Sequence, residues 1–379
     1  MPSRHSPVRP LAGFGFHPPG GPSMDPITSE AVIVGVDTHK DTHVAVALNA
    51  MGARLASASF AVTSHGYKKL AAWATSHGTV HAVGIEGTGS YGAGLARALS
   101  ASGVRVIEVG RVNRQLRHRQ GKTDTVDAES AARAVLAGEA QGEPKSQDGT
   151  VEMIRHLKIA RDTAVKARTQ AMVTLKTLLV NAPQALREKF IGITGRMTLV
   201  RAVAALRPGC TTSPVASAKM ALRALARRWL MLDAEIREHE TVLESLVRKQ
   251  APALMAAAGV STGTIADMLI VLGDNPQRIR SEAAFAKLCG VCPVPASSGK
   301  TRRHRLNRGG NRQANAALHR VAVVRMCHHA PTKDYVARRT AEGKSSREIR
   351  RCIKRYIARE IYRHLCTPKS AAVATLKAT

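Results

Sequence analysis

The amino-acid sequence predicts a mixed α/β domain at the amino end, followed by a helical coiled-coil arm and a mostly α-helical carboxy-terminal domain. Three observations support this fold class. Short apolar runs separated by turn residues occupy residues 31–62, which is typical of strands. Helix-type and strand-type patterns then alternate up to residue 136. Across residues 151–250 the apolar residues recur at helical spacing, and turn residues are scarce.

The first three predicted strands form a meander. Ala31–Val36 is a continuous apolar run, as expected for a central strand buried on both faces. His43–Leu48 is the second apolar run. The turn at residues 49–52 leads to a third strand over about residues 54–62. Short connections of this kind predict antiparallel neighbours.

Helices and strands then alternate. The pattern predicts helices over residues 67–76 and 91–101 and strands over residues 80–85 and 104–109. A last helix covers about residues 124–136. Three meandering strands followed by this alternation are the element order of a ribonuclease-H-like domain.

Composition changes mark the predicted domain boundaries. The amino end is rich in Pro, Gly and Ser and predicts a disordered extension, with Met24 as an alternative start. Two long helical patterns after the first domain predict either a coiled-coil arm or a helical bundle packed on the domains. The predicted segments are the extension at 1–24, the ribonuclease-H-like domain at 25–150, the helical arm at 151–250, the carboxy-terminal domain at 251–365 and a tail at 366–379.

The charge balance predicts a polyanionic partner. Lys and Arg total 57 against 27 Asp and Glu, for a formal net charge of +30. A small neutral substrate does not require such an excess, whereas a nucleic acid supplies the opposite charge. Six Cys at irregular spacing form no disulfide framework and predict a reducing, cytoplasmic location. The sequence contains no apolar run of the ~18 residues that a membrane span needs.

The basic residues are concentrated near the carboxy end. Residues 297–365 hold 19 Lys and Arg against four acids. Aromatic residues are few, with 5 Phe, 5 Tyr and 2 Trp in the whole chain. Nucleic-acid recognition by base stacking needs such side chains, so contacts of Arg and Lys with the backbone are expected to dominate.

Four acidic residues are predicted to converge in the first domain. Asp37 ends the first strand and Glu86 ends the fourth, and these strand ends lie side by side in a ribonuclease-H-like sheet. Asp124 and Asp127 are three residues apart on the last helix and share one face. Clustered carboxylates repel one another, and two Mg²⁺ ions would remove that cost while assisting phosphodiester chemistry.

Each acid also has an ordinary structural interpretation. Asp124 can cap the helix that it opens, Asp127 can interact with the helix dipole, and Asp37 can be a turn residue. A basic segment precedes the helix and is suited to hold a nucleic-acid backbone. Its cationic residues are Arg111, Arg114, Arg117, Arg119 and Lys122.

Three other motifs admit more than one interpretation. Residues 87–92 match a dinucleotide-binding G-x-G-x-x-G, but they follow a fourth strand, and the preceding Glu86 would repel a pyrophosphate. Residues 258–263 suggest either a helix–hairpin–helix turn that binds phosphate or a plain connection. Cys289 and Cys292, with Cys327 downstream, suggest either a zinc site or a buried turn in which Cys acts as a small apolar residue.

Several motifs resemble the DEDD-type insertion-sequence transposases with a RuvC-like amino domain. In the first domain they are Val34-Gly-Val-Asp37-Thr-His-Lys, Glu86-Gly-Thr-Gly-Ser-Tyr-Gly and Lys122-Thr-Asp124-Thr-Val-Asp127-Ala. In the carboxy-terminal domain they are Leu288-Cys-Gly290-Val-Cys-Pro293-Val-Pro-Ala-Ser-Ser298-Gly299-Lys and Gly309-Gly-Asn311. The resemblance covers about residues 31–330.

The resemblance implies a RuvC-like site in which the four acids hold Mg²⁺, and a nucleophilic serine that links covalently to DNA. That serine is identified as Ser298, with the adjacent Ser297 as its rival. The resemblance also implies guidance by an RNA that the element encodes. It further implies assembly as a homo-oligomer, from dimer to tetramer, with sites composed from different subunits. The cations Lys300, Arg302, Arg303 and Arg305 follow the serine and are suited to neutralise the scissile phosphate.

Two other functions stay open at the level of sequence. A plain RuvC-like nuclease would need the four acids but not Ser298. A nucleic-acid-binding protein without catalysis would need neither, and Asp37→Ala would then leave every activity unchanged. The expected location is the bacterial cytoplasm, in association with the nucleoid.

Overall fold

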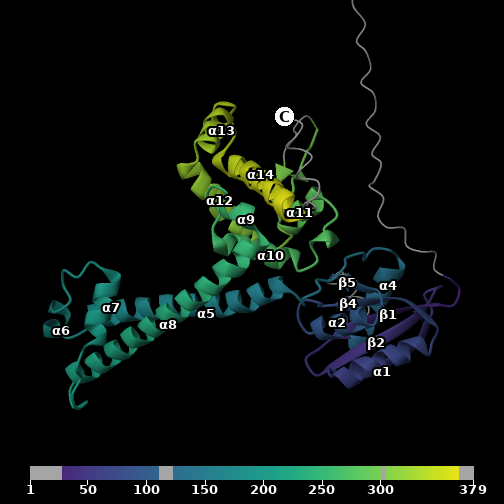
Figure 1. Ribbon diagram of the computed structural model, residues 1–379, viewed down its shortest axis with the longest axis horizontal. Coiled ribbons are helices and arrows are strands. Elements are labelled where there is room, and N and C mark those ends of the chain that lie inside the picture. The colour runs from purple at the N-terminus through teal and green to yellow at the C-terminus, as the bar shows by residue number, and fades with distance from the viewer. Residues whose placement is uncertain (1–27, 111–122, 300–303, 367–379) are drawn as a thin grey trace, which may run out of the picture. The chain divides into compact units, whose positions relative to one another are not determined.

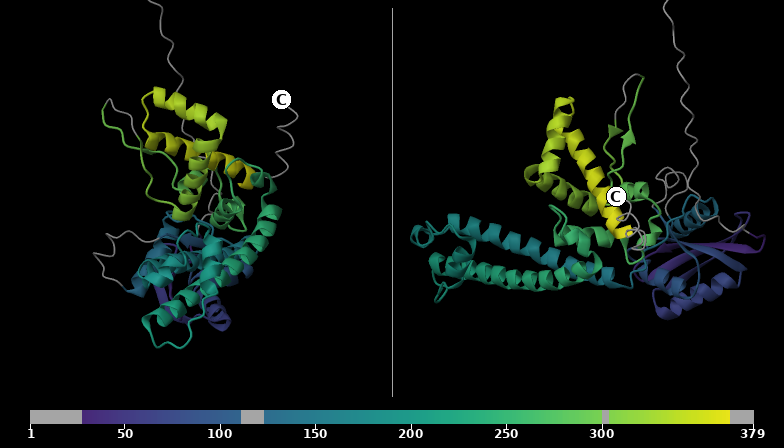
Figure 2. Two further views of the ribbon diagram at one scale, coloured as in Figure 1. Left: turned by 90° about the vertical axis from the view of Figure 1, so that its left-hand side faces the viewer. Right: turned by 45° about the horizontal axis from the view of Figure 1, so that its top comes forward.

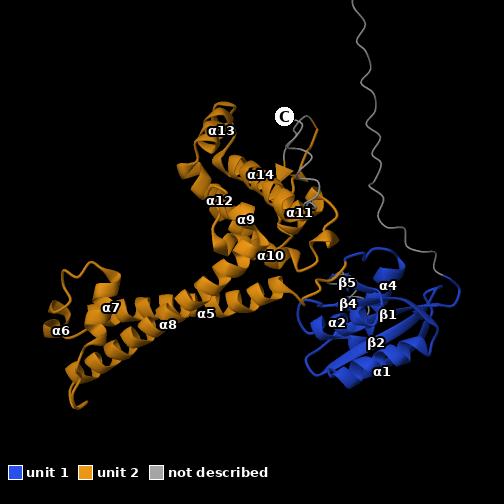
Figure 3. Ribbon diagram, viewed as in Figure 1, with its two compact units in different colours: residues 1–142 blue, residues 143–379 orange. Residues whose placement is uncertain are grey.

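The computed structural model describes residues 28–110, 123–299 and 304–366. The chain divides into two compact units, residues 1–142 and residues 143–379, which are coloured separately in Figure 3. In the described parts of the chain, no helix is both long enough and apolar enough to cross a membrane.

A mixed five-stranded sheet forms the centre of the first unit (Figure 1). Its strands are β1 (Ala31–Thr38), β2 (Thr42–Asn49), β3 (Arg54–Ala61), β4 (Thr79–Glu86) and β5 (Val106–Val109). The strand order is β3-β2-β1-β4-β5. The meander β1-β2-β3 is antiparallel, whereas β4 pairs parallel to both β1 and β5. The predicted ribonuclease-H-like fold class is therefore confirmed.

Helices cover both faces of this sheet. The helices α1 (Ser64–Thr75) and α2 (Ala93–Ala101) pack on one face, where Leu70 and Leu95 lie in a core with Val34 of β1. The helix α4 (Asp124–Leu136) packs on the other face, and its alanines lie against Ile33. The sheet is thus the middle of three layers, which explains the unbroken apolar run of β1.

Two glycines bring α4 unusually close to the sheet. A Cβ atom added at Gly35 of β1 would overlap the backbone of α4 at Ala128. A Cβ atom at Gly84 of β4 would lie 2.7 Å from the Val135 side chain. Side chains two residues apart on a strand share a face. The acids two positions further on, Asp37 and Glu86, therefore lie on the α4 side of the sheet.

A pair of long helices dominates the first half of the second unit. α5 (Thr150–Val180) and α8 (Pro214–Gln250) run side by side, as Figures 1 and 2 show. The short helices α6 (Gln184–Glu188) and α7 (Arg196–Ala204) close the far end of the pair. The shared core includes Trp229. These helices correspond to the predicted helical arm.

The remainder of the second unit is mostly helical, as predicted. Its core is continuous with the near end of the arm, because Ile154 of α5 and Val247 of α8 belong to the same cluster as Phe285. The elements are α9 (Pro252–Met255), α10 (Thr262–Leu272), η1 (Pro276–Arg278), α11 (Glu282–Leu288), β6 (Val294–Pro295), β7 (His304–Arg305), α12 (Arg312–His328), α13 (Ala330–Ala341) and α14 (Ser346–Cys366).

Candidate active site

The first two acids lie at adjacent strand ends. β1 and β4 pair in parallel up to Val36 and Ile85, so that Asp37 and Glu86 are the next residues of each strand. The Thr38 hydroxyl donates a hydrogen bond to the Glu86 carbonyl oxygen over 2.8 Å and ties the two strand ends together. Register and hydrogen bonding therefore place both carboxylates at one edge of the sheet.

The other two acids lie in the first turn of α4. Thr123 caps this helix, and its hydroxyl accepts a hydrogen bond from the Val126 amide over 3.3 Å. The interpretation of Asp124 as the cap is therefore wrong, because the residue before it has that role. Asp124 is exposed, whereas Asp127 is only 5% exposed. The helix start thus presents one open and one enclosed carboxylate.

A histidine that sequence reasoning missed joins Asp37 to Asp124. His39 Nε2 lies 3.2 Å from Asp37 Oδ2 and 3.3 Å from Asp124 Oδ1. The His39 amide donates to the Thr42 carbonyl over 3.2 Å, which extends the β1–β2 ladder past the end of β1. His39 is two residues after Asp37, and residues two apart along a strand share a face, so this spacing was the sequence signal that could have identified His39. Its proximity to Asp124, however, depends on the packing of α4.

The carboxylates influence one another electrostatically. Burial raises the pKa of Asp37, His39 partly opposes that effect, and the negative charges of Asp127 and Asp124 raise the pKa further. The Asp37 side chain is 13% exposed. A cation near these groups would relieve this repulsion.

The donor atoms fit a divalent cation. Asp37, His39 and Asp124 each offer one ligand atom, and these three atoms all lie within 4.8 Å of one another. Carboxylate oxygens are preferred ligands of Mg²⁺ and Mn²⁺, and imidazole nitrogen is a common ligand of transition metals. The fold therefore brings together at least two of the four predicted acids as a possible metal centre, with Asp127 close enough to affect Asp37.

The predicted serines lie in the short hairpin formed by β6 and β7. Ser297 and Ser298 are both exposed, and Gly299 follows them with φ +54°. Arg305 is exposed on β7. The hairpin is therefore accessible to a large substrate on the side of these residues.

Most of the predicted cations near both motifs lie outside the described residues. The residues that lie outside the described part of the chain are Arg111, Arg114, Arg117, Arg119, Lys122, Lys300, Arg302 and Arg303.

Glycines and an asparagine fix the two ends of the hairpin to each other. Gly310 has φ +86°, and a Cβ atom there would lie 2.6 Å from the Gly290 amide nitrogen. The Asn315 side-chain amide donates to the carbonyl oxygens of Cys289 and Gly290 over 3.0 and 2.9 Å. The two halves of the carboxy-terminal signature therefore meet at the base of the hairpin, which accounts for their glycines.

The zinc interpretation finds no support in the structure. Cys289 is fully buried, and burial raises the pKa of its thiol to about 12, which opposes the thiolate that zinc requires. The Cys292 sulfur accepts a hydrogen bond from the Asn307 amide over 3.1 Å. All six cysteines are free. Among the described residues, no cysteine belongs to a group that could hold a metal ion.

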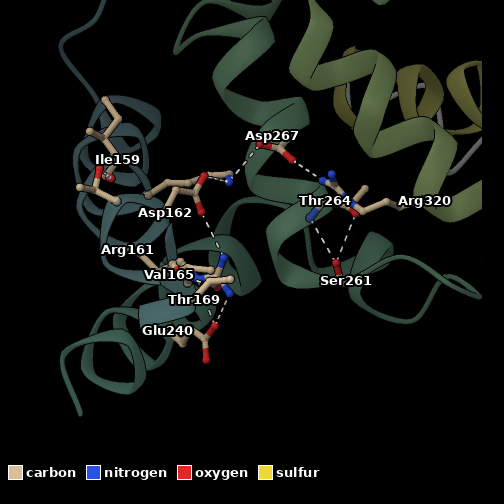
Figure 4. A network of polar contacts seen from close by, with 12 residues as sticks. Ile159, Arg161, Asp162, Val165, Thr169, Glu240, Ser261, Thr264, Asp267 and Arg320 are labelled. Atoms are coloured by element: carbon tan, nitrogen blue, oxygen red, sulfur yellow. Dashed lines mark hydrogen bonds and ion pairs between the residues drawn. The ribbon is translucent and has the colours of Figure 1, made fainter. Parts of the chain in front are cut away.

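A second polar cluster joins the arm to the rest of its unit (Figure 4). Lys158 Nζ of α5 lies 2.6 Å from Asp162 and 3.1 Å from Asp267 of α10. Arg320 of α12 donates to Asp267 over 2.8 Å. Arg161 pairs with Glu240 of α8. These opposite charges neutralise one another beside a cavity of about 610 Å³, and the cluster is best explained as a joint between helices.

The comparisons with known proteins agree with this organisation. Residues 34–182 match a family model described as a transposase, of the DEDD type found in IS110 elements. Residues 251–337 match the model of the transposase IS116/IS110/IS902 family. A search among curated proteins finds no match to this chain. The two models together cover most of the chain, in family order, and include the sheet with its acids and the serine hairpin. The chain therefore belongs to the IS110 family of DEDD insertion-sequence transposases.

Proposed function

We propose that this transposase cuts and rejoins DNA with a metal centre at the edge of its sheet and a serine nucleophile in its second unit. Asp37, Glu86, Asp124 and Asp127 would hold the metal, and Ser298 would attack the DNA. The observation that carries the proposal is the approach of Asp37 and Asp124 to a common point, with their ligand atoms within 4.8 Å. Only tertiary structure brings these residues together.

The metal centre would serve the phosphodiester. A pair of divalent ions, when bound, supplies Lewis acidity that activates an attacking oxygen and stabilises a leaving oxygen. Asp37 and Glu86 would hold their positions through the pairing of β1 and β4, whereas Asp124 and Asp127 would hold theirs through the capped start of α4. Rigid elements of this kind keep ligands in a fixed geometry.

Ser298 would supply the covalent step. Its Oγ attacks phosphorus, the bond between phosphorus and one deoxyribose oxygen breaks, and the serine proton leaves to a base while the departing oxygen gains a proton. The phosphoserine diester keeps the energy of the broken bond. Attack by a deoxyribose hydroxyl of another strand then releases Ser298 and rejoins the DNA. Exposure of the hairpin supports this role, because the nucleophile must reach the DNA backbone.

The partners would be DNA, a guide RNA encoded by the element, and further copies of this chain. The net charge of +30 supports binding of nucleic acid through the backbone. The scarcity of aromatic residues supports a model in which the protein binds the DNA backbone and base pairing by an RNA selects the DNA sequence. The homo-oligomer would range from dimer to tetramer, and the protein would act at the nucleoid in the cytoplasm.

A covalent-adduct assay tests the proposed chemistry. The full chain is incubated with its flanking transcript, Mg²⁺ and labelled junction DNA, and adducts that survive denaturation are counted. We expect an adduct with the wild type and with Ser297→Ala, but none with Ser298→Ala. Metal-dependent cleavage without an adduct would instead favour a RuvC-like nuclease. Loss of the adduct in Ser297→Ala alone would move the nucleophile to Ser297.

A further inference from the structure

His39 occupies an unusual place between two carboxylates of the metal centre. Its Nε2 atom lies almost equally far from Asp37 Oδ2 and Asp124 Oδ1, at 3.2 and 3.3 Å. Both distances exceed the ~2.8 Å typical of a strong hydrogen bond between a charged donor and a carboxylate. The imidazole therefore makes no optimal bond to either acid, although it is directed at both.

The spacing matches that of ligands around one ion. Neighbouring ligands of an octahedral ion lie about 3.0 Å apart when each bond is ~2.1 Å long. The distances from His39 Nε2 to the two carboxylate oxygens are close to this value. All three ligand atoms lie within 4.8 Å of one another, so that they can converge on one cation.

Exposure and backbone geometry favour the same role. The His39 side chain is 49% exposed and Asp124 is 55% exposed, so that an ion can enter from solvent. The His39 backbone is fixed by its hydrogen bond to Thr42. Asp37 is anchored in β1 with a side chain that is only 13% exposed. The site thus combines a rigid inner carboxylate with an accessible outer side.

We propose that His39 is a nitrogen ligand of the ion that Asp37 and Asp124 hold, which gives this centre a preference for Mn²⁺ over Mg²⁺. Mg²⁺ favours oxygen ligands and retains its water, whereas imidazole nitrogen suits transition metals and Mn²⁺ also accepts carboxylates. The proposal rests on the metal centre of the proposed function and adds to it a ligand and a choice of ion.

Metal binding by the full chain tests this ligand directly. Mn²⁺ and Mg²⁺ are titrated into the wild type, His39→Ala, Asp37→Asn and the control His65→Ala, whose side chain is exposed on α1. The bound Mn²⁺ is also examined by pulsed electron paramagnetic resonance for coupling to nitrogen. We expect nitrogen coupling in the wild type and in His65→Ala. We also expect a loss of Mn²⁺ affinity of at least about tenfold in His39→Ala, with a smaller effect on Mg²⁺.

The outcomes separate this inference from the proposed function. A second outcome is that Asp37→Asn loses Mn²⁺, whereas His39→Ala binds Mn²⁺ as tightly as the wild type does and neither His39→Ala nor the wild type shows nitrogen coupling. In that case the metal centre exists and His39 is not a ligand. If His39→Ala binds Mn²⁺ more tightly, the imidazole competes with the ion, and the proposal is overturned. If the wild type and Asp37→Asn bind Mn²⁺ alike, the metal centre itself is wrong. A circular-dichroism spectrum of each variant confirms that it is folded.

Discussion

At the scale of single residues, the carboxylates of the proposed metal centre repel one another in the metal-free protein. Asp37 is largely enclosed, and Asp127 and Asp124 lie near enough to raise its pKa in addition to the effect of burial. Such groups cost stability and are retained where function requires them. His39 partly opposes the effect, since it lowers the pKa of the same carboxyl.

Asp37→Asn is expected to stabilise the metal-free protein at neutral pH. A carboxyl whose pKa is raised on folding stabilises the protein at a pH below its pKa in the unfolded chain, here 3.8. This contribution to stability is lost as the pH rises through the pKa of the folded state. At pH 7 the ionised Asp37 carboxylate therefore destabilises the folded state, and the neutral amide of Asn removes this effect. Urea unfolding at pH 7 should show the gain, and it should shrink toward pH 4. An equal gain in the exposed Asp41→Asn would indicate a general charge effect instead.

Gly35→Ala is expected to destabilise the first unit. The added Cβ atom would overlap the α4 backbone at Ala128, so that the helix must move away from β1. Overpacking of this kind costs about 1–3 kcal/mol or more. Gly89→Ala is the control in the same unit, since a Cβ atom there meets nothing within 4 Å. Urea unfolding of both variants measures the difference, and equal stabilities would contradict the close packing of α4.

At the scale of elements, the sequence pattern predicts where each helix lies, whereas its capping residue sets where the helix begins. The helix over 67–76 begins earlier than predicted, at Ser64, because Thr63 caps it and accepts from the Gly66 amide over 3.0 Å. The helix α8 likewise begins directly after a capping residue, Ser213. Apolar periodicity locates an element, whereas a polar cap outside the apolar pattern sets its first residue.

The hairpin that carries Ser298 depends on a polar contact that no sequence pattern revealed. Lys354 of α14 is 8% exposed and donates to Asn315 Oδ1 over 2.5 Å, while Asn315 donates to the carbonyls of Cys289 and Gly290. Burial lowers the pKa of Lys354. These residues lie far apart in the sequence, so that only the packing of α12 and α14 makes the contact evident.

Asn315→Ala is expected to loosen the base of the hairpin. Two carbonyl oxygens would lose their partner, together with the hydrogen bond to Lys354, and each unsatisfied group costs about 1–3 kcal/mol. We expect lower stability toward urea and slower formation of the Ser298 adduct. Gln313→Ala, at an exposed position on the same helix, should behave as the wild type in both measurements. If Asn315→Ala is destabilised but forms the adduct at the wild-type rate, the hydrogen bonds of Asn315 do not position the hairpin for the reaction.

At the scale of the whole molecule, the sequence predicted the fold class, whereas it predicted the residues of the proposed metal centre only in part. The apolar run of β1 and the alternating elements after it predicted the sheet. Asp37 and Glu86 could be predicted as neighbours because strand ends in a known topology are adjacent. His39 could not, since its contact with Asp124 spans 85 positions and depends on how closely Gly35 lets α4 approach.

The affinity of the full chain for DNA is expected to depend steeply on salt. Its net charge of +30 implies many phosphate contacts, and each one releases counterions from the DNA. With several such contacts the affinity should fall by about 10³-fold or more between roughly 50 and 200 mM salt. Fluorescence anisotropy over this range measures the slope, and a nearly flat response would contradict backbone binding.

Cleavage of junction DNA by two variants of α4 tests the metal centre most directly. Asp124→Asn removes a proposed metal ligand, whereas Glu129→Gln changes an acid of the same helix that pairs with Arg133 over 2.6 Å, outside the centre. With the transcript and Mg²⁺ or Mn²⁺ present, the account predicts that Glu129→Gln cuts DNA as the wild type does and that Asp124→Asn does not. Cleavage by Asp124→Asn at the wild-type rate would contradict the central claim that these acids hold the catalytic metal.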